Sequence, residues 1–75
     1  MVFAFVLADL KKQTEKEFVF EKLKRITEVK KTYLIDGNYD FLMEMEAESL
    51  LHLRETVSKR LSLTGVKSTL FMLRI

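Results

Sequence analysis

The segment DGNYD at residues 36–40 constrains the fold more than any other feature, because it lies between two apolar runs, residues 29–35 and 41–47. Gly37 and Asn38 tolerate the positive φ angles of a tight hairpin, so the two runs are predicted to be neighbouring antiparallel strands. The same segment combines two carboxylates, an aromatic ring and exposed backbone N–H groups, which together can hold a small zwitterion. The competing interpretation is a solvated turn that binds nothing.

The N-terminal part of the chain predicts a strand followed by a helix. Residues 2–9 (VFAFVLAD) are apolar on both alternating faces, which is typical of a central strand that is covered on both sides. Thr14 and Glu17 fit the capping box, in which each side chain binds a free N–H group at the helix start, so we expect a helix from residue 14 to about residue 26. Its inward stripe consists of apolar residues three to four positions apart: Val19, Leu23 and Ile26.

The two apolar runs beside the turn differ in character. Residues 41–47 alternate apolar and polar side chains, as a half-buried strand does. Two adjacent lysines within residues 29–35 suggest an edge strand, because lysine discourages pairing with other chains. Glu44 and Glu46 share the polar face of the third strand, where they form either a solvated surface or an acid–base pair.

The C-terminal part predicts a second helix and a fourth strand. Ser49 has the residue type of a helix N-cap, and Gly65 has that of the residue just past a helix end. Between them, apolar residues recur at spacings of three and four: Leu50, Leu53, Val57 and Leu61. Residues 66–75 are then expected to form the last strand.

This order of elements predicts one α+β domain over residues 1–75, with the ferredoxin-like βαββαβ topology. Right-handed crossovers give a four-stranded antiparallel sheet in the order 4-1-3-2, with both helices on one face. The opposite face is then uncovered, although the first and last strands carry apolar residues on both faces. Because a large apolar patch is unfavourable in water, we expect the sheet to pack against a second copy, in a homodimer or a higher oligomer.

Charge and hydropathy exclude two classes of partner. The net charge of +2 is too small to imply direct nucleic-acid binding or attraction to an anionic membrane. The two glutamates of the third strand also oppose RNA recognition, which needs basic and aromatic residues there. No apolar run reaches the ~18 residues of a membrane span, so we expect a cytoplasmic protein with no membrane partner.

The inventory of reactive residues argues against catalysis and metal binding. The chain has no cysteine, and His52 is its only histidine, so disulfides, thiolate metal sites and the C-x-x-C motif of copper chaperones are excluded. His52 is expected to be an exposed surface residue, and no cluster supports nucleophilic chemistry. We therefore expect no enzyme activity, no catalytic residue, no metal and no cofactor.

The residues around the turn are similar to a known family. Residues 34–41, of which Gly37, Tyr39 and Asp40 are the most specific part, and residues 65–69 resemble the effector domain of the Lrp/AsnC transcription regulators, often called the RAM domain. The resemblance covers essentially the whole chain. It implies dimers that assemble into octamers or similar rings, and amino acids or related small molecules bound between dimers near the G-x-Y-D loop.

What the resemblance implies for the site is a set of residues around this loop: Asp36, Gly37, Asn38, Tyr39, Asp40 and Thr69. Asp40, together with Asp36, is expected to pair with the ammonium group of the ligand, while N–H groups around Gly37 meet its carboxylate. Tyr39 would pack or hydrogen-bond, and Thr69 would reach from the neighbouring strand.

Members of this family also carry an N-terminal helix-turn-helix domain. Because the sequence begins at its first predicted strand, we expect the stand-alone type, with a full-length Lrp/AsnC regulator as a further candidate partner. The sequence departs from the family where Thr27 and Thr64 replace common prolines, and where Phe71 replaces a threonine of the last strand. Phe71 is expected to narrow the pocket.

Two alternative functions remain open. One is a small dimeric α+β-barrel enzyme of the monooxygenase or isomerase type, which would need Glu44 or His52 in a deep pocket. The other is a purely structural assembly domain, for which Phe71 is the main argument.

Overall fold

Four strands form one antiparallel sheet in the order β2-β3-β1-β4, which is the predicted order read from the opposite edge. The computed structural model describes residues 1–12 and 14–74. The elements in chain order are β1 (Val2–Leu10), α1 (Lys16–Lys24), β2 (Val29–Leu34), β3 (Phe41–Ala47), α2 (Leu50–Glu55), the π-helical η1 (Thr56–Leu61), the 3₁₀-helical η2 (Ser62–Thr64) and β4 (Val66–Leu73).

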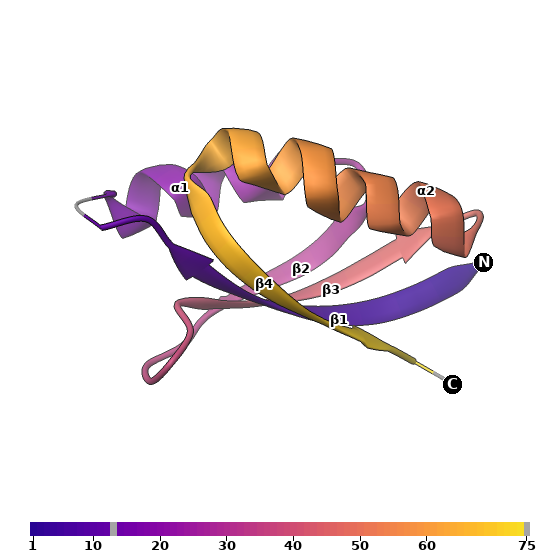
Figure 1. The fold of residues 1–75 in the computed structure, drawn as a ribbon, viewed down its shortest axis with the longest axis horizontal. Coiled ribbons are helices and arrows are strands. Elements are labelled where there is room, and N and C mark those ends of the chain that lie inside the picture. Colours follow the sequence, from indigo (N-terminus) through magenta and orange to yellow (C-terminus); the bar gives the residue numbers. More distant parts are fainter. Residues whose placement is uncertain (13, 75) are drawn as a thin grey trace.

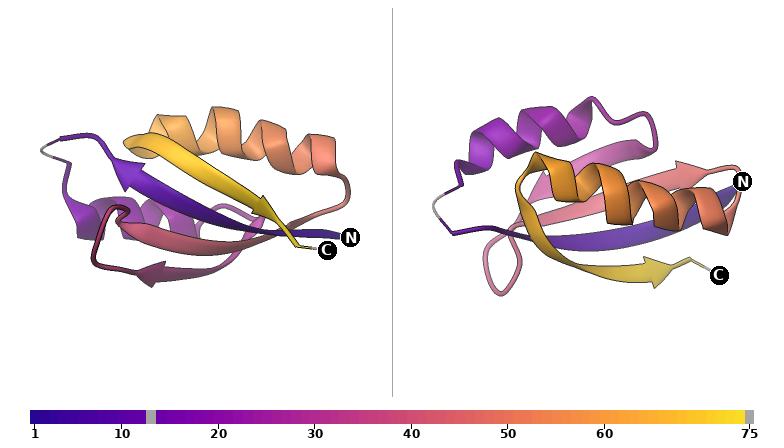
Figure 2. Two further views of the ribbon diagram at one scale, coloured as in Figure 1. Left: turned by 60° about the horizontal axis from the view of Figure 1, so that its bottom comes forward. Right: turned by 45° about the horizontal axis from the view of Figure 1, so that its top comes forward.

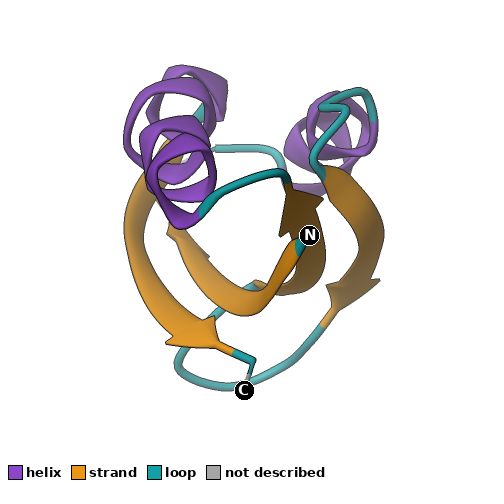
Figure 3. Cartoon of the chain, turned by 90° about the vertical axis from the view of Figure 1, so that its right-hand side faces the viewer, coloured by secondary structure: helices purple, strands orange, loops and turns teal. Residues whose placement is uncertain are grey.

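Both helical segments lie over the same face of the curved sheet and leave the other face uncovered (Figure 1, Figure 3). The two segments lie side by side on that face, as the right-hand view of Figure 2 and the end-on view of Figure 3 show. The predicted α+β, ferredoxin-like βαββαβ arrangement is therefore confirmed. Neither segment, within the residues that the structure describes, is long and apolar enough to cross a membrane.

The start of α1 differs from the prediction. The helix begins at Lys16, and Glu15 takes the N-cap position with an extended backbone. Within the described residues the Glu15 side chain makes no capping hydrogen bond, so the predicted Thr14–Glu17 capping box is wrong. Thr14 instead lies against the start of β4, where a Cβ atom added to Gly65 would approach the Thr14 methyl group to 3.0 Å. Packing of Thr14 beside Gly65 therefore replaces the capping role that the local sequence predicted for Thr14.

The second helical segment begins as predicted and continues in an unexpected form. The Ser49 hydroxyl accepts the His52 N–H at 3.1 Å, and Gly65 ends the segment with a φ of +105°. Between them the chain forms a π-helical turn, in which Thr56 and Leu61 are both buried. These two residues are five positions apart, the spacing that a π-helix brings onto one face.

The core lies between the helices and the covered face of the sheet. On the sheet side its buried residues alternate along β1 and β3: Ala4, Val6, Ala8, Phe41, Met43, Met45 and Ala47. The helical side contributes the two predicted stripes in large part: Val19, Leu23, Ile26, Leu53 and Leu61. Leu50 is exposed and Val57 is only partly buried.

Over β1 and β4 the uncovered face is apolar, as the sequence predicted, whereas on β3 it carries Glu44 and Glu46. Phe5 lies opposite Met72, and Leu7 lies opposite Leu70, so large apolar side chains from β1 and β4 form one continuous patch. Phe3 and Phe5 are 40% and 37% exposed. Four residues of this surface are each more than one-third exposed and are called the open-face patch below: Phe3, Phe5, Leu70 and Met72.

Candidate functional site

The loop of residues 35–40 joins β2 to β3 and lies at the end of the molecule opposite the two termini (Figure 1). Its ends are closed by one hydrogen bond, in which the Ile35 N–H donates to the Asp40 carbonyl at 3.0 Å. Gly37 has a φ of +144°, and apart from Gly37 and its two chain neighbours no described atom lies within 4 Å of the position that a Cβ atom would take there. The loop is longer than a two-residue hairpin, and its bend requires glycine at Gly37 for conformational reasons alone.

Asp40 fixes this loop to the end of β1. Its N–H donates to the Ala8 carbonyl at 2.9 Å, and its carboxylate Oδ2 accepts the Leu10 N–H at 2.9 Å. Leu10 follows a register shift between β1 and β4, where a backbone N–H needs an acceptor outside the regular ladder. Asp40 supplies that acceptor.

Lys16 occupies the other side of the same carboxylate. Its ammonium group lies 3.5 Å from Asp40 Oδ1 and donates a hydrogen bond to the Ile35 carbonyl at 3.0 Å. The two side chains are about one-third exposed, at 36% for Lys16 and 31% for Asp40. The sequence interpretation missed Lys16 and Leu10, because they lie 24 and 30 residues away from Asp40 and no local motif connects them.

The other predicted loop residues surround this anchor. Asp36, Gly37 and Asn38 are exposed, and Tyr39 is half-buried like Asp40. The structure therefore brings together five of the six predicted site residues simply because they belong to one loop.

Thr69 lies elsewhere. In the sheet, Ala8 pairs with Phe41 of β3 on one side and with Thr69 of β4 on the other. Thr69 is thus two strands away from the end of the loop, about 10 Å at the usual strand spacing. It lines a groove of about 380 Å³ beside the second helical segment, together with Arg54, Glu55, Val57, Ser58 and Phe71. Within one chain, Thr69 does not share the loop site.

Phe71 partly fills this groove from the covered side of β4. Its ring packs against the core, and the Arg54 guanidinium carbon lies 5.0 Å from the ring centre. Such a stacked cation lies within the range of a favourable cation–π contact. The bulky residue that replaces threonine therefore has structural partners of its own.

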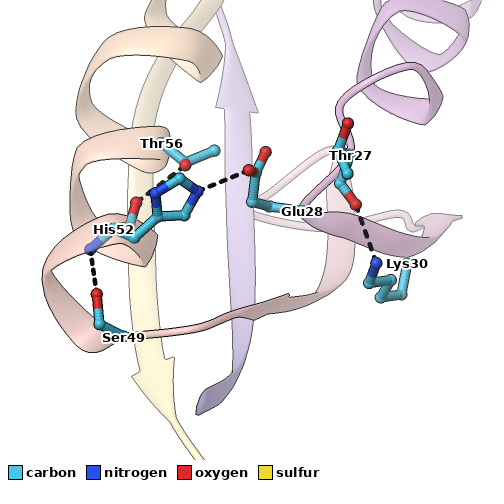
Figure 4. Close-up of polar contacts among 6 residues, drawn as sticks. All are labelled: Thr27, Glu28, Lys30, Ser49, His52 and Thr56. Atoms are coloured by element: carbon cyan, nitrogen blue, oxygen red, sulfur yellow. Dashed lines mark hydrogen bonds and ion pairs between the residues drawn. The ribbon is translucent and has the colours of Figure 1, made fainter. Parts of the chain in front are cut away.

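At the opposite end, His52 pairs with Glu28 (Figure 4). The His52 Nε2 atom lies 2.7 Å from Glu28 Oε2, and the His52 side chain is 54% exposed, whereas that of Glu28 is 14% exposed. The hydrogen bond from His52 is the main reason why the pKa of Glu28 is lowered from its ordinary value of 4.5. The exposure of His52 was predicted from the sequence, whereas its acidic partner was not.

A concavity of about 600 Å³ lies beside this pair and is lined by residues including Lys30, Glu46 and Ser49. Glu28 Oε1 is buried and has no hydrogen-bond partner within residues 1–12 and 14–74. In that same described part of the chain, no three histidine, cysteine, aspartate or glutamate residues gather in a way that would hold a metal ion.

Glu44 lies on the uncovered face of the sheet. Its carboxylate accepts the Tyr33 hydroxyl at 2.7 Å, and this hydrogen bond raises the pKa of Tyr33 above its ordinary value. The enzyme alternative needs Glu44 or His52 in a deep apolar pocket. Glu44 lies instead on an open sheet surface, and His52 is largely exposed, so neither placement supports that alternative.

Comparisons with known proteins agree with the fold. FFRP-DM1 is 32% identical, with a TM-score of 0.89 and 100% of both chains covered. PHS023, a hypothetical protein from Pyrococcus horikoshii, is 29% identical, with a TM-score of 0.86, and the match covers 100% of this chain and 90% of that one.

A transcriptional regulator from Neisseria meningitidis in complex with L-methionine shares the fold at 18% identity and a TM-score of 0.84. That match covers 99% of this chain and 49% of the regulator, so the chain spans about half of the regulator's length. Among proteins with curated descriptions, none matches this sequence.

The family comparison decides the assignment. The model of the Lrp/AsnC ligand-binding domain matches residues 2–74, from the first residue of β1 to one residue past β4. The matched region includes the anchored loop and both helical segments. The chain therefore belongs to the Lrp/AsnC ligand-binding domain family.

Proposed function

We propose that this domain senses an amino acid or a closely related zwitterion and couples its binding to self-assembly. The single observation that carries the proposal is the loop of residues 35–40, which Asp40 ties to the end of β1 by hydrogen bonds, inside a domain of a ligand-binding family. A related regulator of the same fold forms a complex with L-methionine. A preorganised loop favours binding, because less conformational freedom is lost when the ligand arrives.

The proposed contacts follow from the chemistry of the loop. The carboxylates of Asp40 and Asp36 would hold the ligand ammonium, and exposed N–H groups around Gly37 would hold its carboxylate. Tyr39 would pack against the ligand or hydrogen-bond to it. Thr69 would contribute from a neighbouring chain, since it is about two strand spacings from the loop in its own chain.

Self-assembly would use the open-face patch. The four residues of this patch lie on adjacent strands and are each more than one-third exposed. Covering them with a second copy removes apolar surface from water at about 25 cal/mol per Å². A ligand that binds better to one assembly than to another would shift the equilibrium toward that assembly by its difference in affinity. The proposed partner is a second copy of this chain in a homodimer, and a full-length Lrp/AsnC regulator is the further candidate.

Isothermal titration calorimetry against the twenty amino acids tests the ligand part of the proposal. We expect at least one amino acid to bind. Asp40→Asn should lower the affinity for this amino acid, although the variant keeps an acceptor for the Leu10 N–H. Glu21→Gln is the matched control, because it removes one exposed carboxylate from α1. Absence of heat with all twenty, or equal binding by wild type and Asp40→Asn, would contradict the proposed site.

A domain that assembles without a ligand is the second candidate. Phe71 favours it, because this residue fills part of the groove beside Thr69 and has Arg54 stacked on it. Phe71→Thr distinguishes the two candidates: if the groove belongs to the ligand site, this variant should bind an amino acid more tightly than wild type does.

A further inference from the structure

We propose that the ammonium group of Lys16 occupies the place of the ligand's ammonium, so that a ligand binds only by displacing the chain's own cation. This inference rests on the proposed function and concerns the regulation of that same site. It follows from what surrounds the Lys16 ammonium: a carboxylate oxygen of Asp40 at 3.5 Å and the Ile35 carbonyl oxygen at 3.0 Å.

The acceptors around Lys16 are those that any primary ammonium needs. An alkylammonium has three N–H donors and no acceptor, so it is best held by a carboxylate together with carbonyl oxygens. The end of the loop supplies one of each, and Lys16 uses both. An amino acid that approached Asp40 would therefore meet a site that already contains a cation of the same kind.

The contact between the Lys16 ammonium and the Asp40 carboxylate is weak enough for another ammonium group to replace Lys16. The separation of 3.5 Å from Asp40 exceeds the 2.7–2.9 Å that is typical of a strong charge-assisted hydrogen bond. Both side chains are about one-third exposed, so water and solutes reach them. Lys16 is also the first residue of α1, where the positive end of the helix dipole disfavours a cation.

Departure of Lys16 would leave the loop in place. The second carboxylate oxygen of Asp40, Oδ2, accepts the Leu10 N–H, and the Asp40 N–H remains bound to the Ala8 carbonyl. The Ile35 N–H also stays bound to the Asp40 carbonyl. One ammonium can thus replace another without a change in the backbone, and the tethered lysine sets a threshold that the ligand concentration must exceed.

The alternative role of Lys16 is purely structural, as a staple between α1 and the loop. The two roles predict opposite effects of Lys16→Met on binding. Removal of a competitor strengthens binding of an ammonium ligand, whereas removal of a staple loosens the loop and weakens it. Lys16→Arg keeps a cation at the site and should bind as weakly as wild type does.

The test uses two probes on the full chain. The first is the amino acid that gives the largest heat in the calorimetric screen. Lys16→Met should lower the Kd of this amino acid about three- to fivefold, because the ligand no longer has to break a surface ion pair in order to bind. The second is methylammonium chloride, followed through the backbone amide signals of Leu10 and Asp40 by NMR. Its ionic control is tetramethylammonium chloride, which has no N–H donor.

Lys24→Met is the matched variant, because it makes the same change of net charge in the last turn of the same helix, where Lys24 contacts Glu21 and the Phe20 ring instead of Asp40. The inference is supported if Lys16→Met binds the amino acid more tightly than Lys24→Met does, or if methylammonium shifts the Leu10 and Asp40 signals at lower concentration in Lys16→Met. Equal or weaker binding of both probes by Lys16→Met overturns it.

The result also separates this inference from the proposed function. If no amino acid binds but methylammonium still reaches Asp40 more readily in Lys16→Met, the masked ammonium site stands and amino-acid sensing fails. If an amino acid binds wild type, but neither this amino acid nor methylammonium binds Lys16→Met more tightly than wild type, amino-acid sensing stands and the masking role of Lys16 fails.

Discussion

The two faces of β1 differ in the size of their apolar side chains, which are small on the face toward the helices and large on the uncovered face. Ala4, Val6 and Ala8 point toward the helices and are buried, whereas Phe3 and Phe5 point to the uncovered face and are more than one-third exposed. If β1 contributed only to the core of its own chain, larger apolar side chains on its buried face would stabilise the fold more. The small residues allow the helices to approach the sheet closely, and the large residues are then left for a surface that nothing within residues 1–12 and 14–74 covers.

The largest expected effect is on the covered face. Phe41 is fully buried, and its ring stacks on that of Phe20 with the centres 6.1 Å apart. Phe41→Ala should lower the free energy of unfolding by about 3–5 kcal/mol, because it leaves a cavity in a core that has few residues. Urea unfolding followed by circular dichroism measures this loss. A loss below about 1 kcal/mol would show that the core lies elsewhere.

A substitution on the open face should act on assembly instead of folding. Phe5→Lys removes an exposed apolar side chain and places a charge in the open-face patch, next to Met72 and opposite Glu44, which a lysine does not repel. In a symmetric dimer the change occurs twice, so we expect self-association to weaken at least about tenfold while the circular dichroism spectrum is unchanged.

Light scattering across a concentration series measures this effect. Glu21→Gln, on the helical side, provides a control that should leave the mass unchanged. A wild-type protein that is monomeric at every concentration up to the millimolar range would contradict assembly through this face.

The alternation of these faces explains how much of the fold could be predicted. The bounds of β3 were predicted residue for residue, because buried and partly buried side chains alternate without interruption along it. The Ser49 cap and the end at Gly65 were predicted because each depends on the backbone geometry of one residue. The turn between β2 and β3 was located correctly for the same reason, since a bend at Gly37 is a local property.

What could not be predicted depends on residues that are distant in sequence. The contacts of Asp40 with Leu10 and Lys16, and of Glu28 with His52, join residues 24 to 30 positions apart. Nothing in the local sequence of Asp40 indicates that its carboxylate binds its own chain. The π-helical turn at Thr56 and the unused capping box at Thr14 are likewise set by packing against other elements.

The anchored loop provides the next prediction, of intermediate size. Asp40→Ala removes the acceptor of the Leu10 N–H and should lower the free energy of unfolding by about 1–3 kcal/mol, the cost of a partly buried donor without a partner. Asp40→Asn keeps an oxygen for this N–H and should cost less. Urea unfolding of both variants measures the difference, and an equal loss would show that the negative charge, not the hydrogen bond, holds the loop.

The smallest expected effect depends on pH and concerns Glu28. Because the pKa of Glu28 in the folded protein is lowered from 4.5, the unfolded chain binds its proton first as the pH falls. The stability that the Glu28–His52 pair contributes is therefore present above about pH 4.5 and is lost as the pH falls through the lowered pKa. His52→Ala should lower the free energy of unfolding by about 0.5–1.5 kcal/mol at pH 6 and by less at pH 3.

Lys30→Ala is the matched control for this pH dependence. Lys30 lies beside the same pair and donates to the Thr27 carbonyl, an acceptor that does not titrate (Figure 4). Its effect on the free energy of unfolding should therefore be similar at pH 6 and pH 3. If His52→Ala also costs the same at both values, the hydrogen bond between His52 and Glu28 does not stabilise the charged carboxylate. The second helical segment would then be held to the sheet mainly by its apolar packing, Leu53 and Leu61 above all, through the same covered face that Phe41 occupies.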